Sequence, residues 1–351
     1  MKIPQRPEDV TPPWLTEVVQ DVAPGAEAGR VEVIDAHSGT TGRARLRVEW
    51  LSGDLPNAVF AKLAPTDPIQ RAMAIDLRMG AREARFYDSV GRELPVRVPR
   101  PIRSVWTKDG REYLMLLEDL ESSGCDFPRF ETTGDLRVVR AAVEALADLH
   151  GGFWNSARFA NDLAWIEPPM RGDVGLSLIG AGVEQFGDTQ PPAFHEVARI
   201  YLEHNADLCD LLASGTPTLL HGDPHLGNMF LDGERVGLLD WACVARGPAL
   251  RDVAYFLGAS VSTELRRAEE RGLIERYLDR LAASGAPAPS FDEAWRAYRI
   301  HVANAWVAAT ATLAAGARMQ RLDVGRRAVT RANATLEDLG TAAVLSEELS
   351  L

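Results

Sequence analysis

Apolar runs bounded by turn residues recur through the first third of the chain and predict short strands. Residues 31–50 follow the order strand, flexible turn, strand, and Leu46, Val48 and Trp50 alternate with polar positions at the two-residue period of a half-buried strand. Further apolar runs occupy residues 57–63 and 113–120. We therefore expect this part of the chain to form a small sheet.

Helical periodicity dominates the remainder of the chain. Residues 69–90 predict one helix, and residues 135–150 predict another, with apolar side chains recurring on one face. A capping Thr11 precedes prolines suited to a first helical turn, and Ser290 with Glu293 matches a capping box. The pattern predicts an α+β protein whose last third is helical.

One segment carries the strongest functional signal. In residues 219–241, two apolar runs predict short buried strands, and a turn at 232–233 predicts a small hairpin. Asp223 stands where a carboxylate could orient a hydroxyl and accept its proton. Asn228 and Asp240 supply oxygen ligands suited to a hard cation such as Mg²⁺. This spacing of acid, amide and acid is the one that phosphoryl transfer to a hydroxyl requires.

Two other interpretations of this segment stay open at this stage. It could be an ordinary strand-to-loop turn, shaped by Pro224 and Gly227. It could also be a metal-hydrolase cluster, with ligands drawn from His221, Asp223, His225 and Asp240.

The H-x-D-x-x-x-x-N string, followed by two apolar residues and Asp240, resembles the catalytic and metal loops of the protein-kinase-like fold. It is most similar to the variant found in aminoglycoside phosphotransferases, choline kinases and the ecdysteroid-kinase-like family. Gly222 stands where protein kinases usually have Arg, and Trp241 and Ala242 stand where they have Phe-Gly. The resemblance therefore implies a small-molecule kinase with two lobes: a small N-lobe containing an antiparallel sheet, and a larger, mainly helical C-lobe.

A flexible turn in the amino-terminal third is the candidate phosphate-binding loop. Glycines there would let backbone amides approach phosphate oxygens without a Cβ clash, as the glycine-rich loop of a kinase does, although any hairpin tip favours such residues. The candidate residues are Ser38, Gly39, Thr40, Thr41 and Gly42.

Lys62 ends an apolar run, and a Lys inside a strand is costly to bury unless a carboxylate pairs with it. Glu83, on the predicted helix, is the expected partner. In the kinase-like fold this pair positions the α- and β-phosphates of the nucleotide. The resemblance also places an interlobe hinge at residues 118–120, where backbone groups of Glu118 and Leu120 would read the adenine edge.

Two further residues match the family pattern outside these motifs. His150 ends an L-x-x-L-H string, and we expect it to pack and form hydrogen bonds under the catalytic loop. Asp252 lies in a G-P-x-x-x-D-x-A string, and we expect it to brace the catalytic loop through hydrogen bonds.

Composition narrows the range of partners. The 351-residue chain has a formal net charge of -12 and no basic run, which disfavours a general nucleic-acid surface. It has no apolar run long enough to span a bilayer and no apolar core of a signal peptide near its start. Three scattered cysteines fit a reducing compartment. We therefore predict a soluble cytoplasmic protein, monomeric or homodimeric, that does not bind nucleic acid or membrane.

The predicted protein is an ATP- or GTP-dependent, Mg²⁺-dependent kinase of a small hydroxyl compound, with an N-lobe over residues 1–118 and a C-lobe over 119–351. A catalytically weak pseudokinase and the metal-dependent hydrolase are the alternatives. The predicted acceptor is an antibiotic, a sugar, a polyketide or another alcohol. Aminoglycosides, being polycations, need an acidic pocket, and the sequence does not place the acids of this chain.

Overall fold

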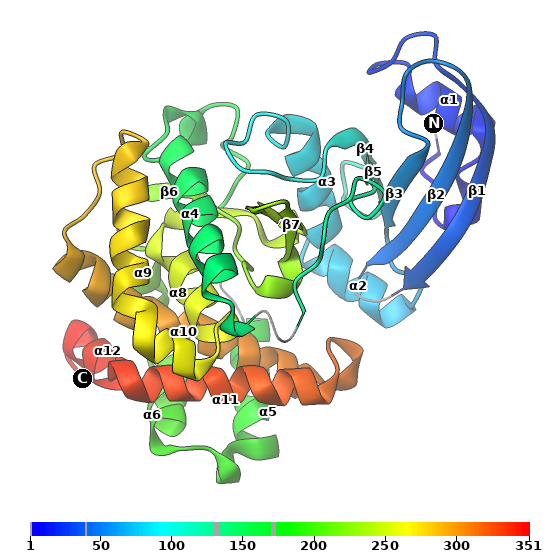
Figure 1. Cartoon of the computed structure of the whole chain (residues 1–351). Helices are drawn as coiled ribbons and strands as arrows, with labels where there is room; N and C mark the ends of the chain where they lie inside the picture. The colour runs from blue at the N-terminus through cyan, green and yellow to red at the C-terminus, as the bar shows by residue number, and fades with distance from the viewer. Residues whose placement is uncertain (1, 39–40, 130–132, 170–172) are drawn as a thin grey trace. The chain divides into compact units, whose positions relative to one another are not determined.

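The computed structural model describes residues 2–38, 41–129, 133–169 and 173–351 (Figure 1). The chain divides into two compact units. The first contains Met1–Phe127, Phe230–Gly233 and Gly237–Cys243, and the second contains Pro128–Met229, Glu234–Val236 and Val244–Leu351. The functional boundary predicted between residues 118 and 119 stays a prediction.

The first unit is built on a five-stranded antiparallel sheet, drawn in blue to cyan in Figure 1. Its strand order is β1-β2-β3-β5-β4. The strands are β1 (Glu27–Ser38), β2 (Gly42–Ser52), β3 (Ala58–Leu63), β4 (Pro101–Trp106) and β5 (Tyr113–Glu118). The helices of this unit are α1 (Pro12–Val19), α2 (Pro68–Asp76) and α3 (Met79–Ser89), with short 3₁₀ turns at η1 (Pro7–Asp9) and η6 (Trp241–Cys243).

The alternation predicted for residues 46–50 places one face of β2 in the core. Leu46 and Val48 are buried, whereas Arg47 between them points to the other face and is exposed. The same core includes Leu15 of α1, a helix that begins after Thr11 as predicted, with the Thr11 hydroxyl accepting a hydrogen bond from the Trp14 amide.

The single helix predicted over residues 69–90 is wrong. The structure has two helices, and Arg78 between them adopts the left-handed conformation, with φ of 52°. Gly80, in the first turn of α3, lies against the ring of Tyr113 on β5, so that an added Cβ would stand 1.9 Å from Tyr113 Cζ. Because the helix is interrupted at Arg78, α3 can start with Gly80 packed against the Tyr113 ring. A contact between residues so far apart in sequence leaves no local pattern from which to predict it.

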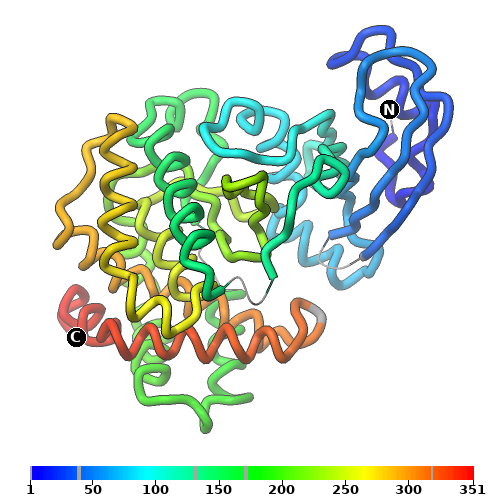
Figure 2. Tube along the Cα trace, in the orientation of Figure 1, coloured from blue at the N-terminus to red at the C-terminus, as the bar shows by residue number. Residues whose placement is uncertain are grey.

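The second unit is mainly helical, and Figure 2 traces it in colour order from α4 in green to α12 in red. Its α-helices are α4 (Leu136–Gly152), α5 (Asp173–Phe186), α6 (Pro192–Glu203), α7 (Asn205–Ala213), α8 (Leu250–Ser260), α9 (Thr263–Ala283), α10 (Phe291–Ala315), α11 (Leu322–Leu339) and α12 (Thr341–Leu349). Short 3₁₀ turns in the described part of this unit include η3 (Ala157–Ala160), η4 (Gly187–Thr189), η5 (Leu226–Asn228) and η7 (Gly316–Arg318). α11 packs along both α8 and α10.

Several sequence predictions for the second half of the chain are confirmed. α4 spans the predicted helix and buries Val139, Val143, Leu146 and His150. α10 begins with the Ser290–Glu293 capping box. β7 (Met229–Asp232) and β8 (Arg235–Leu238) form the predicted hairpin, and Gly233 in its turn has φ of 63°. Among the helices of the described residues, none combines the length and apolarity that crossing a membrane would require.

Candidate active site

The catalytic loop follows a short buried strand of the second unit. β6 (Pro217–Leu220) pairs with β9 (Ala245–Pro248), and both Leu219 and Leu220 are fully buried. Gly222 then takes φ of 85°, a conformation that favours glycine, and the loop ends in the 3₁₀ turn that contains Asn228. The apolar run thus anchors the loop, and the glycine turns the chain at its start.

Both carboxylate oxygens of Asp223 accept hydrogen bonds within this unit. The Tyr255 hydroxyl donates to Oδ1 over 2.5 Å, and Asn228 Nδ2 donates to Oδ2 over 3.1 Å. Asn228 Nδ2 also lies 3.0 Å from the carbonyl oxygen of Asp223. The Asp223 side chain is nevertheless about 30% exposed, so a carboxylate fixed in orientation still has lone pairs open to a ligand.

Asp252 braces the start of the loop, as predicted. Its Oδ2 accepts the His221 amide at 2.7 Å, and its Oδ1 accepts the Gly222 amide at 3.1 Å. The buried His150 lies beneath, with Nε2 3.4 Å from Asp252 Oδ2 and Nδ1 2.9 Å from the Tyr277 hydroxyl. The hydrogen-bonding role predicted for His150 is therefore confirmed as well. Asp252 and Tyr255 stand three residues apart on α8, so one helix face holds both the backbone of the loop, through Asp252, and the Asp223 carboxylate, through Tyr255.

A cavity of about 370 Å³ opens beside Asp223 within the second unit. Its walls come from the catalytic loop, α8, α10 and α11, together with Pro128, Arg129 and Thr133. This volume is at the lower end of the range of about 300–1,000 Å³ for small-molecule pockets.

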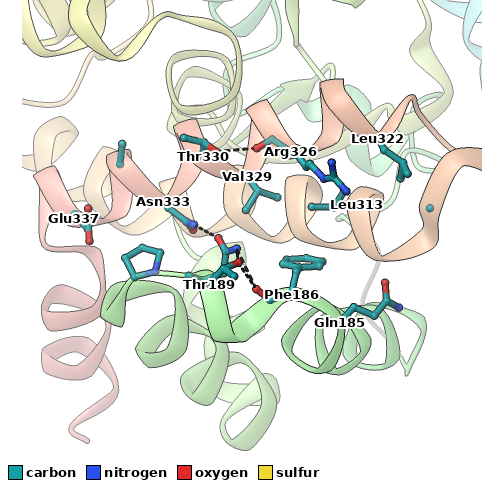
Figure 3. A pocket seen from close by; sticks show the side chains of 14 residues that line it. Gln185, Phe186, Thr189, Leu313, Leu322, Arg326, Val329, Thr330, Asn333 and Glu337 are labelled. Atoms are coloured by element: carbon teal, nitrogen blue, oxygen red, sulfur yellow. Dashed lines mark hydrogen bonds between the residues drawn. The ribbon is translucent and has the colours of Figure 1, made fainter.

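A second hollow of about 720 Å³ lies between η4 and α11, and Figure 3 shows the side chains around it. Asn333 donates a hydrogen bond of 2.8 Å to Gln190 across this hollow. None of its lining residues belongs to the catalytic loop. The smaller cavity is therefore the candidate acceptor site, because it contains Asp223.

Lys62 lies between two carboxylates in the first unit. Its Nζ is 2.6 Å from Glu83 Oε2 and 3.1 Å from Asp240 Oδ1, and only about 5% of the Lys62 side chain is exposed. The ion pair predicted from the order of these residues is confirmed. Asp240 as its second partner was not predicted. The role of the pair in binding phosphates stays a prediction.

Burial and neighbouring charges shift the pKa values of this group. Burial raises the pKa of the Glu83 carboxyl to about 6, although Lys62 acts in the opposite direction and Asp240 adds to the rise. Burial lowers the pKa of Lys62, but the negative charges of Asp240 and Glu83 outweigh it and leave that pKa above its ordinary value. Lys62 is therefore a fully charged ammonium at neutral pH.

Asp240 is held in a conformation that few residues other than glycine adopt, with φ of 65°. The next residue, Trp241, is fully buried and stacks on Phe86 of α3, with ring centroids 4.1 Å apart. Its backbone amide donates to Glu83 Oε1 over 3.2 Å. These contacts tie the candidate metal-binding carboxylate to the helix that carries Glu83.

The predicted hinge residues have structural contacts of their own. Glu118 Oε1 accepts from Arg97 over 2.7 Å, Oε2 accepts from the Arg100 amide over 3.0 Å, and the Glu118 amide donates to the Arg100 carbonyl. Leu120 is buried, and its carbonyl accepts from the Cys125 amide. Adenine recognition by backbone groups of Glu118 and Leu120 stays a prediction.

The candidate phosphate loop is described only in part. Ser38 ends β1, Gly42 begins β2, and the two are register partners; Gly39 and Thr40 lie outside the described residues. The Thr41 hydroxyl accepts from Arg43 Nε over 3.2 Å. An added Cβ at Gly42 would stand 3.1 Å from the Ala64 carbonyl, so close strand packing also accounts for this glycine. Phosphate binding by these residues stays a prediction.

The oxygen donors Asn228 and Asp240 suit Mg²⁺ chemically. Because Asn228 Nδ2 donates to Asp223, its Oδ1 is the atom that would bind a cation. Among the described residues, no group of three or more His, Cys, Asp and Glu side chains is arranged to hold a metal ion. The metal-hydrolase interpretation uses His221 as a possible metal ligand. In the structure, His221 Nδ1 instead accepts a hydrogen bond of 3.3 Å from the Asp223 amide.

Besides the contact of Asp240 with Lys62, the contacts made by Tyr255 and Arg43 were not predicted from the sequence. Tyr255 carries a local signal, because it follows Asp252 by three residues on the same helix face. Arg43, whose guanidinium lies 3.4 Å from Asp240 Oδ2, carries none, because the two residues are 197 positions apart.

The model of the phosphotransferase enzyme family matches residues 74–301. A solved structure from Ralstonia eutropha JMP134, assigned as an aminoglycoside phosphotransferase, is 16% identical, with a TM-score of 0.51 over 93% of this chain and 97% of that chain. A choline/ethanolamine kinase family protein from Mesorhizobium loti is also 16% identical, with a TM-score of 0.52 over 91% of this chain and 93% of that chain. No curated protein matches the sequence. At these identities the likeness shows the fold, and the predicted kinase-like α+β class is confirmed. The closer resemblance to ecdysteroid-kinase-like proteins stays a prediction.

Proposed function

This chain belongs to the phosphotransferase enzyme family, and from that premise we propose that it transfers the γ-phosphoryl group of ATP or GTP, with Mg²⁺, to a hydroxyl of a small molecule. One observation carries the proposal. Asp223 has both oxygens held by Tyr255 and Asn228, and it lines a cavity of about 370 Å³. A carboxylate fixed in orientation at the wall of a cavity can hold a hydroxyl and take its proton.

In the proposed reaction, the acceptor oxygen forms a bond to the γ-phosphorus while the bond from that phosphorus to the β–γ bridging oxygen breaks. The hydroxyl proton passes to the Asp223 carboxylate, and the nucleoside diphosphate leaves. Such reactions depend chiefly on positioning and charge stabilisation, so the hydrogen bonds to Asp223 contribute by fixing the acceptor's direction of approach.

In the proposed mechanism the charged groups of the first unit serve the nucleotide. Lys62, kept cationic by Glu83 and Asp240, would contact the α- and β-phosphates. Asp240 and Asn228 would be protein ligands of Mg²⁺, which neutralises charge on the phosphates when bound. These four residues and Asp223 are all present in the chain, and this disfavours the pseudokinase alternative.

The names of the two similar structures suggest acceptors of different kinds, an aminoglycoside and choline or ethanolamine. At 16% identity, neither acceptor can be assigned to this chain from these names. We propose a small hydroxyl compound as the partner, and we retain a monomeric or homodimeric cytoplasmic protein, without nucleic-acid or membrane binding, as predictions.

The proposal is tested by measuring ATP and GTP consumption with a library of hydroxyl compounds, with product phosphorylation confirmed by mass spectrometry. Asp223→Asn should lower the transfer rate by about 10²- to 10⁴-fold while Mg·ATP still binds in calorimetry. Near-normal turnover by the folded variant would mean that Asp223 is not the group that accepts the proton of the hydroxyl. Binding of Zn²⁺ in place of Mg·ATP, with hydrolysis in the absence of nucleotide, would favour the metallohydrolase instead.

A further inference from the structure

The walls of the cavity beside Asp223 carry a charge opposite in sign to that of the chain as a whole. The formal net charge of the protein is -12. Among the described residues around this cavity, however, three are arginines (Arg129, Arg327 and Arg331) and one, Asp223, is a carboxylate. Arg327 is ion-paired with Asp323, whose Oδ2 lies 2.9 Å from the guanidinium, so Arg129 and Arg331 set against Asp223 give the lining its positive formal charge.

Arg331 is the arginine of this group least exposed to solvent. It is half-buried on α11, and its guanidinium lies 3.4 Å from the Thr133 hydroxyl. Burial and the positive charge of Arg327 both lower the pKa of Arg331, although Glu264 acts in the opposite direction. The local environment thus disfavours a further cation and favours an anion.

Small apolar side chains also line the cavity. Five alanines line it, on α8, α10 and α11: Ala259, Ala305, Ala308, Ala309 and Ala328. Methyl groups leave space and offer no hydrogen-bond partner, so they suit an apolar ligand body. The volume of about 370 Å³ limits that body to a small one.

We propose that the acceptor of the phosphoryl group is a small hydroxy acid: an alcohol with a short apolar body and an anionic group, whose hydroxyl is held at Asp223 and whose anion is held by Arg331. This inference rests on the proposed function and names its substrate class. Polycationic acceptors are disfavoured, because they would place positive charge beside the arginines. Guanidinium groups suit carboxylates geometrically as well as electrostatically.

α11 also supplies a matched control. Arg326 is exposed and lines the separate hollow of Figure 3, and it is not among the residues that line the cavity beside Asp223. Arg326→Ala therefore removes the same charge from the same helix without altering the cavity beside Asp223.

The probes are matched alcohols that differ only in their terminal group: 6-hydroxyhexanoate, 1,6-hexanediol and 6-aminohexan-1-ol, together with the four-carbon equivalents. Binding to the full chain is measured by calorimetry at constant ionic strength, and ATP consumption is measured in parallel. We expect a hydroxy acid to bind most tightly and to be the best acceptor. Arg331→Ala should weaken its binding by about 10- to 100-fold, as expected for loss of a charge-assisted hydrogen bond, whereas Arg326→Ala and the diol should show little change. Arg331→Lys should recover part of the loss.

Tighter binding of the amino alcohol, equal loss in Arg326→Ala, or no hydroxy-acid binding in the millimolar range would overturn the inference. So would a loss of Mg·ATP affinity in Arg331→Ala with hydroxy-acid binding intact, because the arginine would then serve the nucleotide. ATP consumption with the diol or the amino alcohol but with neither acid would overturn the inference and leave the proposed function standing. If a hydroxy acid bound in an Arg331-dependent way but no acceptor led to nucleotide consumption, the anion site would be supported and the proposed kinase activity contradicted.

Discussion

The Tyr255 hydroxyl donates a hydrogen bond of 2.5 Å to Oδ1 of Asp223, from the helix that also anchors the start of the catalytic loop through Asp252. This bond fixes the rotation of a carboxylate whose other oxygen is held by Asn228. In the proposed mechanism Tyr255 would be a positioning residue that acts on the acceptor through Asp223.

Replacing Tyr255 with Phe should lower kcat by about 10- to 100-fold, because it removes a hydrogen bond to a charged group. The KM for ATP should be unchanged, and kinetics with a fixed acceptor separate the two constants. Tyr298→Phe is the matched control, since it also removes a hydroxyl bonded to a carboxylate, 2.9 Å from Glu270. If both variants lost kcat equally, and in proportion to the fall in their melting temperatures, Tyr255 would have a structural role alone.

Asp240→Asn should lose the Mg²⁺-dependent part of ATP affinity, by at least about tenfold, since even indirect damage to a metal ligand costs 10- to 100-fold. Asn is the appropriate replacement because it tolerates the left-handed backbone that Asp240 adopts. ATP binding is titrated with and without Mg²⁺, and Asp232→Asn, in the same unit, is the control. If the parent protein bound ATP equally well with and without Mg²⁺, Asp240 would need another role.

Lys62→Met and Glu83→Gln should each lower kcat/KM strongly, and the double variant should be little worse than either, because residues that act as a unit are non-additive. A double-mutant cycle with Mg·ATP measures this coupling. Small and additive losses would mean that the pair has no joint catalytic role.

The two single variants should differ in stability. Glu83→Gln leaves Lys62 paired with Asp240, whereas Lys62→Met leaves two carboxylates without the ammonium between them. We expect Lys62→Met to melt at the lower temperature at pH 7, because removing one partner of a buried ion pair costs about 3–5 kcal/mol. Thermal melts of both variants, and their order, check this expectation.

His301 should make stability depend on pH. Burial lowers the pKa of His301 to about 3, with Arg251 adding to the effect and Asp252 opposing it, whereas an unfolded His titrates near 6.5. Between these values the unfolded chain binds a proton that the folded chain does not, so stability falls as pH drops below about 6.5. Denaturant unfolding from pH 8 to 5 should show this loss, and a folded His301→Asn variant should show a shallower dependence. Equal slopes in the two proteins would contradict the buried neutral His.

Features of the site that depend on short stretches of sequence could be predicted. The strand before His221, the hairpin turn at Gly233 and the α10 capping box each have a local signal, and all three are present. Lys62 and Glu83 could be paired because a buried ammonium requires a carboxylate.

Features set by contacts between distant residues could not be predicted. Shortly after the break at Arg78, Gly80 packs against the ring of Tyr113 on a separate strand. Arg43 lies close to Asp240 because residues 237–243 return to the first unit. The positive lining beside Asp223 likewise combines residues from separate segments around 129, 223 and 331. Net charge indicated an acidic protein and gave no sign of a basic cavity.

The return of residues 237–243 to the first unit has a consequence for synthesis on the ribosome. The amino-terminal part of that unit ends at Phe127, and Cys243 is added 116 residues later, roughly 6–23 s at about 5–20 residues per second. Until then, Phe86 lacks the Trp241 ring that stacks on it, and Lys62 lacks one of its two carboxylates. The nascent first unit therefore stays incomplete while most of the enzyme is translated, and a gene truncated after residue 127 would encode a fragment without the residues that close its core.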